Sequence, residues 1–460
     1  MCVTRIVSRI TFLPTPPFNA LRLKALTLKA GSGRIVTALG IAQGKGGEKM
    51  KSMKWFLGLS LVLLVLISLN ACQRQSPPVS STIGKGQVKG MAAAPTRAWT
   101  FLFYLDGDNN LDSYGQYNIN QIVSAMTSDQ TSDQKINVIV LYDHLGAPAE
   151  LLKVTAAGVV KLADYGEPDM GAPATLQKFL ADAAAAYPAD HYVVDIWDHG
   201  GGWKTVCVDD TSGSKMMLDG LTQAVKAAAT QIGRDKFDIT LFDACLMSMV
   251  EVVDQLKNAT SYTVASETAV GNYGFPYDTM IKRLIANPAQ TPATYAKGIC
   301  DDYITLYAKS KADATAFDES KIQPLVTAID NFAVTLINNM VAYRNQIGKA
   351  RSNAKCTAYG TQGVFWFDDI KMFVNSLAQS TGNPTLQAQA AAVNTALAAA
   401  LYERHTSQLN GRQTGLSINF PVNYTKYTDK NWMAQNYAGI GLIFPAETHW
   451  DEMLLAYYGN

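Results

Sequence analysis

A histidine and a cysteine each stand directly after an apolar run that predicts a buried strand. His199 follows the run 191–197 and precedes the three glycines 200–202, which allow backbone N–H groups to approach a substrate oxygen closely. Cys245 follows the run 238–242, and we expect it to open a helix whose N-terminus favours the thiolate. A thiol and an imidazole on neighbouring strand ends can reach hydrogen-bonding distance. The two segments therefore predict a cysteine nucleophile with a histidine base.

Asp243 stands two residues before Cys245 at the same strand end. Because side chains alternate along a strand, positions 243 and 245 face the same side, so this carboxylate lies near the thiol and can form the floor of a pocket for a cationic side chain. The alternative is that Asp243 only caps the following helix. In that case Glu267 is the next acid to consider for the pocket.

Two other residues compete for the catalytic roles. Cys207 lies in the segment 204–208 with no helix opening behind it, and His144 is not followed by a row of glycines. A single cysteine or histidine is more often structural than catalytic. The joint placement of His199 and Cys245 at strand ends favours that pair.

The spacing of the cysteines and acidic residues does not match a known metal-binding motif. The chain has 6 cysteines, but no CxxC pair and no zinc-type spacing, so we expect no metal site. Alternating acids in 106–112 resemble the start of a calcium loop, yet Leu111 and Tyr117 stand where an EF-hand needs Gly and Glu. Turn formation is the more common use of such residues, and calcium remains the alternative.

The elements that position these residues alternate between strands and helices. Such alternation predicts an α/β fold with a mostly parallel sheet covered on both faces, and with polar residues meeting beyond the carboxyl ends of the strands. The expected strands are 99–105, 136–142, 191–197, 238–242 and 262–265, with a hairpin at 151–162, and the expected helices are 174–186, 218–232 and 246–256.

After about residue 276 the chain becomes rich in predicted helices. Amphipathic stretches cover 278–287, 293–309 and 321–347, and an Ala-rich stretch covers 385–402. The short apolar run 415–420 predicts a strand that completes the sheet or a subdomain packed on it.

The first seventy residues contain a predicted export signal. A basic segment at 50–54 precedes the apolar run 55–67, which is shorter than the roughly 20 residues of a membrane-spanning helix and is typical of a secretory signal. Residues 69–72, Leu-Asn-Ala-Cys, resemble the lipobox of bacterial lipoproteins, which implies cleavage before Cys72 and lipid on its thiol. Gln73 favours sorting to the outer membrane in a diderm host.

This interpretation divides the chain into segments. Residues 1–49 are expected to be a mis-assigned upstream start, 50–71 a lipoprotein signal peptide, 72–98 the lipidated cysteine with a flexible tether, and 99–460 the folded domain. The net charge of the chain is +1. Residues 1–71 contain ten Lys and Arg and one Glu, a charge of +9, so residues 72–460 carry a charge of −8. An acidic body argues against nucleic acid as a partner.

Several motifs together resemble the clostripain family of cysteine peptidases, which are relatives of the caspases. They include 104–112 (YLDGDNNLD), 198–203 (DHGGGW) and 241–247 (LFDACLM), and the likeness continues through 170–176, 265–268, 274–277, 415–421 and 450–453. It spans nearly all of 99–458. The order of the histidine and cysteine motifs makes the resemblance specific.

The resemblance implies a caspase-like α/β fold with a catalytic core at about 99–275 and a helix-rich part at about 276–460. Cys245 would be the nucleophile, His199 the general base and then acid, and the N–H groups of Gly200 and Cys245 would stabilise the oxyanion. Asp243 would select Arg, and less well Lys, in protein or peptide substrates.

Members of this family are often activated by self-cleavage between the two motifs, where Lys204 and Lys215 lie. We expect no cofactor, although clostripain itself resembles a calcium-requiring class. The interpretation is a lipid-anchored endopeptidase of the bacterial cell envelope. The alternative is a catalytically silent surface lipoprotein that binds peptides or glycans in the same cleft.

Overall fold

The computed structural model describes residues 27–29, 35–37, 93–354, 367–409, 413–428, 437 and 441–459. The chain divides into two units, Met1–Ser81 and Thr82–Asn460. In the first unit β1 (Thr27–Lys29) pairs antiparallel with β2 (Ile35–Thr37). The predicted signal peptide, Cys72 and most of the tether lie outside the described residues. Within the described ranges we find no helix with the length and apolar character that a membrane span requires.

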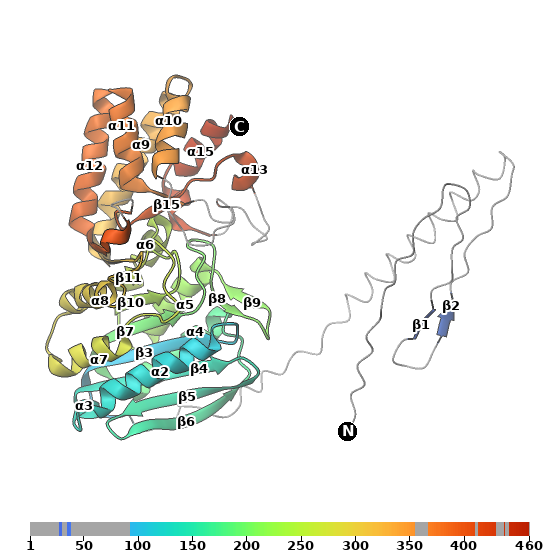
Figure 1. Ribbon diagram of the computed structural model, residues 1–460, viewed down its shortest axis with the longest axis vertical. Helices are drawn as coiled ribbons and strands as arrows, with labels where there is room; N and C mark the ends of the chain where they lie inside the picture. The colour runs from blue at the N-terminus through green and yellow to red at the C-terminus, as the bar shows by residue number, and fades with distance from the viewer. Residues whose placement is uncertain are drawn as a thin grey trace. The chain divides into compact units, whose positions relative to one another are not determined.

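A nine-stranded sheet forms the centre of the second unit (Figure 1). Its order is β14-β12-β11-β10-β7-β3-β4-β5-β6, with the five central strands parallel and two antiparallel strands at each edge. The strands are β3 (Arg97–Gly107), β4 (Ile136–His144), β5 (Ala147–Thr155), β6 (Gly158–Gly166), β7 (Ala189–Trp197), β10 (Phe237–Asp243), β11 (Thr260–Ala265), β12 (Asp313–Asp318) and β14 (Leu401–His405). The predicted α/β class with a mostly parallel sheet is confirmed.

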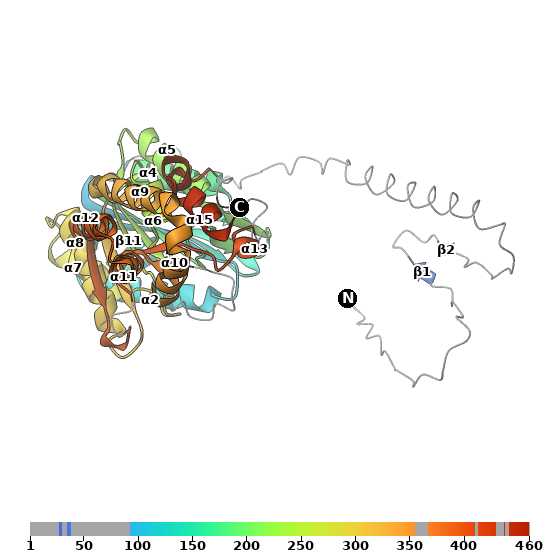
Figure 2. The ribbon, with the colours of Figure 1, turned by 90° about the horizontal axis from the view of Figure 1, so that it is seen from above.

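Helices cover both faces of this sheet, as the apolar runs of the central strands require. On one face Phe101 and Phe103 pack among apolar residues of α2, α7 and α8, and on the other face Leu102 and Tyr104 share a core with α4, α5 and α6. Figure 2 shows α4 and α5 on one side and α2 on the other. The helices are α2 (Asp112–Thr127), α4 (Pro173–Ala186), α5 (Leu218–Gln231), α6 (Val250–Leu256), α7 (Tyr277–Ala286) and α8 (Pro292–Leu306), with the short α3 (Ser132–Lys135) before β4.

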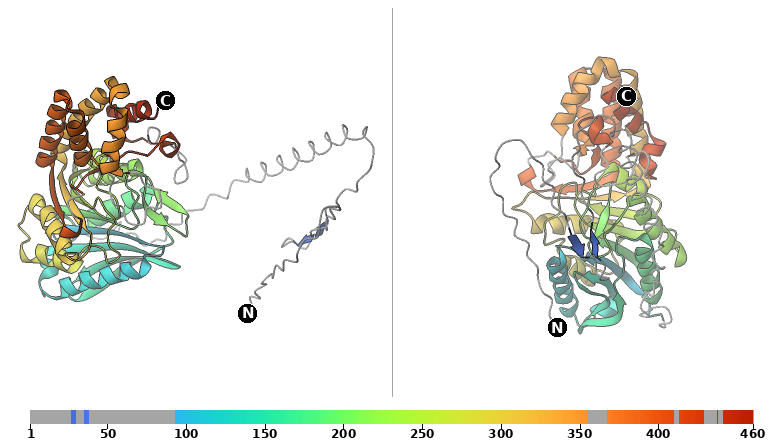
Figure 3. Two further views of the ribbon diagram at one scale, coloured as in Figure 1. Left: turned by 45° about the horizontal axis from the view of Figure 1, so that its top comes forward. Right: turned by 90° about the vertical axis from the view of Figure 1, so that its right-hand side faces the viewer.

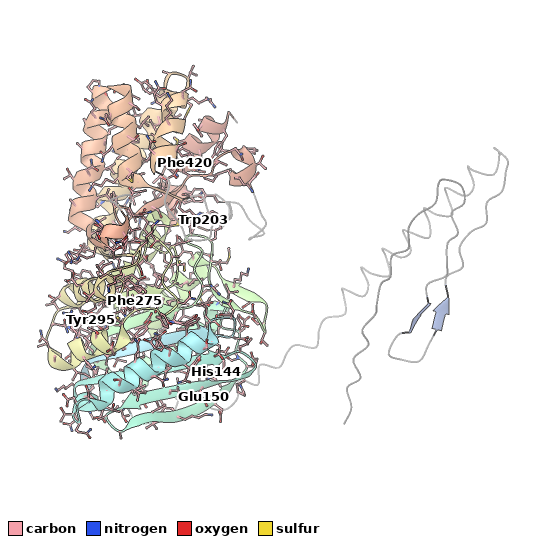
Figure 4. All side chains as sticks on the ribbon, in the orientation of Figure 1. His144, Glu150, Trp203, Phe275, Tyr295 and Phe420 are labelled. Carbon is pink, nitrogen blue, oxygen red and sulfur yellow. The ribbon has the colours of Figure 1, made fainter. Side chains whose placement is uncertain are left out.

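A helical layer follows in the C-terminal part, as predicted (Figure 3). It shares one core with α6, so it extends the domain instead of forming a separate one. Its helices are α9 (Ile322–Asn338), α10 (Met340–Ala354), α11 (Ile370–Thr381), α12 (Pro384–Ala400) and α15 (Trp450–Tyr458), with the short α13 (Tyr424–Tyr427) and α14 (Ile443–Glu447). In Figure 4 the labelled Phe420 lies toward this layer, and Phe275 and Tyr295 lie beside α7 and α8.

The strand predicted at 415–420 is present as β15 (Ser417–Asn419), and of the two alternatives it does not complete the main sheet but pairs with β13 (Phe367–Asp369). Other predicted boundaries are wrong. One edge strand of the main sheet is β14, which pairs with β12. Residues 401 and 402, the last two of the helix expected at 385–402, belong to this strand. The stretch 321–347 is two helices, because Asn339 leaves the helical conformation between α9 and α10.

The helix expected at 246–256 begins four residues late, at Val250. Leu246 has a positive φ of 68°, which ends any helical path there. Its N–H donates to the Thr268 carbonyl oxygen, and the Ser248 N–H donates to the Ser266 carbonyl oxygen. Long-range backbone pairing therefore replaces the first helical turn.

Candidate active site

The residues that follow β7 and β10 line one cavity of about 720 Å³ at the carboxyl edge of the sheet. These strands are neighbours, and their parallel register sets Trp197 beside Asp243. The wall consists of Leu111, residues 197–199, 243–245, 269–272 and 274, Tyr303, Tyr307, residues 309–312 and Gln408. His199, Cys245 and Asp243, predicted from separate segments, thus meet in one cavity.

The imidazole of His199 is held by a neighbouring turn. Its Nε2 lies 3.0 Å from Oδ1 of Asn110, and because an amide oxygen can only accept, Nε2 carries the proton and Nδ1 is left basic. Burial lowers the pKa of His199, opposed by the charge of Asp210. A neutral imidazole is the form that can act as a base.

Asn110 is a site residue that sequence reasoning missed. It belongs to the turn after β3, which we considered for calcium and as part of the motif 104–112, but Asn110 itself was given no catalytic role. That turn is fixed by Asn109, whose Oδ1 accepts from the Leu111 N–H at 2.8 Å and whose Nδ2 donates to Asp198 Oδ1 at 2.7 Å. The only signal in the sequence was its position after a strand end.

Gly200 brings the histidine and cysteine segments into backbone contact. A Cβ atom at this position would lie closer than 3.0 Å to both the backbone oxygen and the backbone nitrogen of Cys245. Only glycine permits this approach. The glycine that we predicted to face a substrate oxygen therefore also sets the spacing between the two segments.

Cys245 is partly buried, and its thiol lies 3.8 Å from the carbonyl oxygen of Val270. The expectation that a helix N-terminus lowers its pKa is wrong, because α6 begins only at Val250. Burial raises the pKa of Cys245 to about 11, with smaller contributions from the charges of Asp243 and Asp198 and an opposing one from the Val270 contact. The resting thiol therefore keeps its proton, and a base must remove it when substrate binds.

Asp243 does not cap α6, which excludes the alternative left open above. Its Oδ2 accepts from the Phe275 N–H at 2.9 Å and from the Tyr277 hydroxyl at 2.7 Å. Gly274 passes so close that a Cβ there would clash with the same oxygen. Burial raises the pKa of Asp243 to about 7, while these two hydrogen bonds lower it. The carboxyl is thus fixed in the cavity wall by contacts with a distant loop.

The competing residues lie outside the cavity wall. Cys207 is fully buried, and burial raises its pKa well above the usual value. The His144 ring lies against that of Tyr142, with 3.6 Å between the ring centroids and 37° between the ring planes. Glu267 Oε2 accepts from the Gly415 N–H at 3.0 Å, which ties it to the C-terminal segment.

The interval between the two motifs forms a hairpin of β8 (Val206–Asp209) and β9 (Ser214–Met216). The Val208 N–H donates to the Asp198 carboxylate, which joins the hairpin to the histidine segment. Lys215 is exposed on β9, and the Lys204 ammonium lies 5.5 Å from the centre of the Trp203 ring.

Two acids at the ends of β3 and β4 lie side by side. Asp106 and Asp143 are register partners and both are fully buried, and among the described residues none of their carboxylate oxygens has a hydrogen-bond partner of normal geometry. Burial raises the pKa of both, to about 8 for Asp143, and neighbouring carboxylates raise it further. Across the described ranges we find no group of three or more Asp, Glu, His or Cys arranged to hold a metal ion.

Comparisons with known proteins agree with the motifs. The model of the clostripain family matches residues 103–457. Clostripain of Hathewaya histolytica is 24% identical over 310 residues, which cover 52% of this chain and 56% of clostripain. The chain thus matches little more than half the length of that curated relative.

Two solved structures share the fold. An inactive zymogen C11 protease from Parabacteroides distasonis has a TM-score of 0.57 and 22% identity, covering 72% of this chain and 94% of that one. A secreted C11 cysteine protease from Bacteroides thetaiotaomicron, in complex with an irreversible peptide inhibitor, has a TM-score of 0.55 and 21% identity, covering 78% and 99%.

Gly200→Ala should abolish most peptide hydrolysis while the protein stays folded. The added methyl group pushes the histidine and cysteine segments apart, and a displacement of this size costs on the order of hundredfold in kcat/KM. Gly213→Asn is the matched control, because Gly213 has a φ of 69° and open space around it, a conformation that Asn tolerates. Near-normal kcat/KM for Gly200→Ala, with an unchanged Tm, would contradict the close-contact argument.

Proposed function

The chain belongs to the clostripain family of cysteine peptidases, and from this premise we propose that it hydrolyses peptide bonds after Arg, and less well after Lys, with Cys245 as nucleophile and His199 as base. The observation that carries the proposal is that His199, Cys245 and Asp243 line one cavity at adjacent strand ends. A thiol, a base and a buried carboxylate are the groups that this reaction needs.

In the first step His199 takes the proton of the Cys245 thiol as the thiolate attacks the scissile carbonyl carbon. His199 then gives the proton to the leaving amine, which leaves a thioester acyl-enzyme. Water, deprotonated by the same imidazole, releases the acid product. Because the pKa of Cys245 is raised, the free enzyme holds a neutral thiol, and the thiolate forms only as the sulfur attacks the substrate.

The oxyanion of each tetrahedral intermediate would accept hydrogen bonds from the N–H groups of Gly200 and Cys245. Their backbones are in contact, so both donors lie near the reacting sulfur. Donors fixed before the reaction stabilise developing charge without the cost of reorganisation.

Asn110 would act as a positioning residue for His199. The Oδ1 atom of Asn110 accepts a hydrogen bond from Nε2 of His199, which leaves Nδ1 as the basic nitrogen. The turn that carries Asn110 is held by the hydrogen bond from Asn109 to Asp198. The hydrogen bond to His199 favours the enzyme over a catalytically silent binding protein with the same cleft, which has no need of a fixed tautomer.

No cofactor enters these steps. Calcium, the alternative for the turn 106–112, needs about six to eight oxygen ligands. Because the described ranges hold no group of three or more Asp, Glu, His or Cys arranged for a metal ion, we assign calcium no residues. No step of hydrolysis passes through it.

Replacing Cys245 by Ala, or His199 by Ala, should each remove nearly all hydrolysis of a fluorogenic arginyl peptide at an unchanged Tm. Acyl-enzyme formation needs both the thiol and the proton acceptor. Asn110→Ala should lower kcat by about tenfold or more, in the range of an impaired general base. Cys207→Ser is the control and should stay active. Turnover by Cys245→Ala would exclude this nucleophile.

Asp243→Asn should lower kcat/KM for arginyl peptides by at least about thirtyfold, because losing one charged partner in a desolvated pocket costs roughly 2–5 kcal/mol. Wild-type enzyme should prefer arginyl to lysyl peptides, since a carboxylate binds a guanidinium through two parallel hydrogen bonds. Alkylation of Cys245 by iodoacetamide is the control for an intact nucleophile. An unchanged preference for Arg would move the pocket to another acid.

We propose a signal peptide at 50–71 and lipid on Cys72, both outside the described residues, followed by a tether to residue 98, whose end enters β3 at Arg97, and the peptidase domain at 99–460. The similar protease from Bacteroides thetaiotaomicron is described as secreted, which supports export. The lipid would hold the enzyme on the cell envelope, at the outer membrane of a diderm host.

Mass spectrometry of the native protein should find a lipidated N-terminal Cys72 and no peptide from residues 1–49. A native peptide covering 14–22 would contradict the upstream-start interpretation. Cys72→Ala should release the enzyme from membranes and leave its kcat/KM unchanged, because the tether separates the anchor from the folded domain.

A further inference from the structure

A second carboxyl group lies behind the wall of the specificity pocket. Asp195 stands within β7, beside Leu241 of β10 and Phe103 of β3, and is fully buried. Within the described part of the chain neither of its oxygens receives a hydrogen bond of normal geometry. Its polar neighbours are the Tyr277 hydroxyl and the backbone N–H of Asp243. The proposed mechanism gives this residue no role.

Tyr277 connects this carboxyl to the pocket. Its hydroxyl donates to Asp243 Oδ2 at 2.7 Å and lies near Asp195, with no hydrogen bond of normal geometry between the two. The ring is fully buried, and its centroid lies 4.8 Å from that of Phe103. The hydroxyl is therefore held at a fixed point between two carboxyls, and it has only one proton to donate.

The surroundings offer little to balance two negative charges here. The titratable groups that face this pair are Tyr277, Tyr295, Tyr303, Tyr307 and Cys245, all neutral near pH 7, with Lys309 and Lys311 on the cavity wall. Two buried carboxylates around one phenol repel each other, and such a pair divides into one acid and one anion. Asp243 reaches the cavity, so it is the member that a cationic substrate can stabilise.

We propose that Asp195 is a positioning residue for the specificity pocket: it keeps a proton near neutral pH and donates it to the Tyr277 oxygen, so that the Tyr277 proton stays committed to Asp243. This inference rests on the proposed role of Asp243. An ionised Asp195 would instead compete with Asp243 for the same Tyr277 proton. A chain of donors that all point one way strengthens each hydrogen bond in it.

The test is the pH profile of kcat/KM for an arginyl peptide, which reports groups of the free enzyme. Arg binding needs ionised Asp243, so removing a donor to that carboxylate raises its pKa and moves the acid limb to higher pH. Tyr277→Phe should move the limb up by about one pH unit. Asp195→Val, which removes the donor to Tyr277, should move it in the same direction by a smaller amount.

Asp195→Asn is the rescue variant, because an amide is neutral, similar in shape and still donates to the Tyr277 oxygen. Its acid limb should match that of wild type. A downward shift would show that wild-type Asp195 is ionised, and an unchanged limb in Asp195→Val would show that the residue has no effect on the pocket. Either result overturns the proposal. The alkylation rate of Cys245 across the same pH range separates these shifts from changes in the catalytic pair.

An infrared difference spectrum of wild type against Asp195→Asn near pH 7 covers the case in which Asp195→Val fails to fold. It should show the loss of the C=O stretch of a protonated carboxylic acid, and a carboxylate band in its place would overturn the inference. This measurement needs no substrate. If the wild-type enzyme showed no preference for Arg, the proposed specificity would be wrong. The infrared spectrum would still determine whether Asp195 is protonated.

Discussion

The backbone of Gly200 lies against the backbone of Cys245, and this contact fixes how far apart the two reacting side chains are held. It is possible because β7 and β10 run parallel and end together, with Trp197 beside Asp243. Cys245, His199 and Asp243 thus take their positions from strand register. The helices on the two faces keep that register by burying the sheet, and the turn with Asn110 then orients the imidazole.

The region around the cavity concentrates acids that water cannot reach. Asp106, Asp143 and Asp195 are all fully buried at or near the ends of central strands. Each raises the free energy of the folded state when it ionises, because burial disfavours the charged form. The large apolar cores on both faces of the sheet offset that cost. Buried acids with raised pKa also lie away from the cavity, at Glu251 and Glu319, so burial of an acid does not by itself mark a functional site.

The central strands could be predicted because burial on both faces produces continuous apolar runs, as in β3 and β4. Helix α2 was missed, since Ile119, Ile122 and Met126 stand among Asn, Gln and Ser and give a weak periodic pattern. The motifs identified His199, Cys245 and Asp243. Asn110 and Tyr277 stand in the motifs 104–112 and 274–277 but were given no role, because they contact the site across 89 and 34 residues of chain, and no local pattern encodes such pairs. The late start of α6 has the same cause.

The chain that links the histidine and cysteine segments runs through the β8–β9 hairpin and α5. The two segments are held side by side by the pairing of β7 with β10 from Ile239 to Asp243, which includes neither Lys204 nor Lys215. A molecule cut there would keep its native arrangement while folded. Once unfolded, however, it would consist of two pieces that must meet again by diffusion, so its recovery would depend on concentration. An intact chain refolds as one molecule at any concentration. A cut chain refolds only where its two pieces are concentrated enough to associate, so at high dilution its unfolding is irreversible.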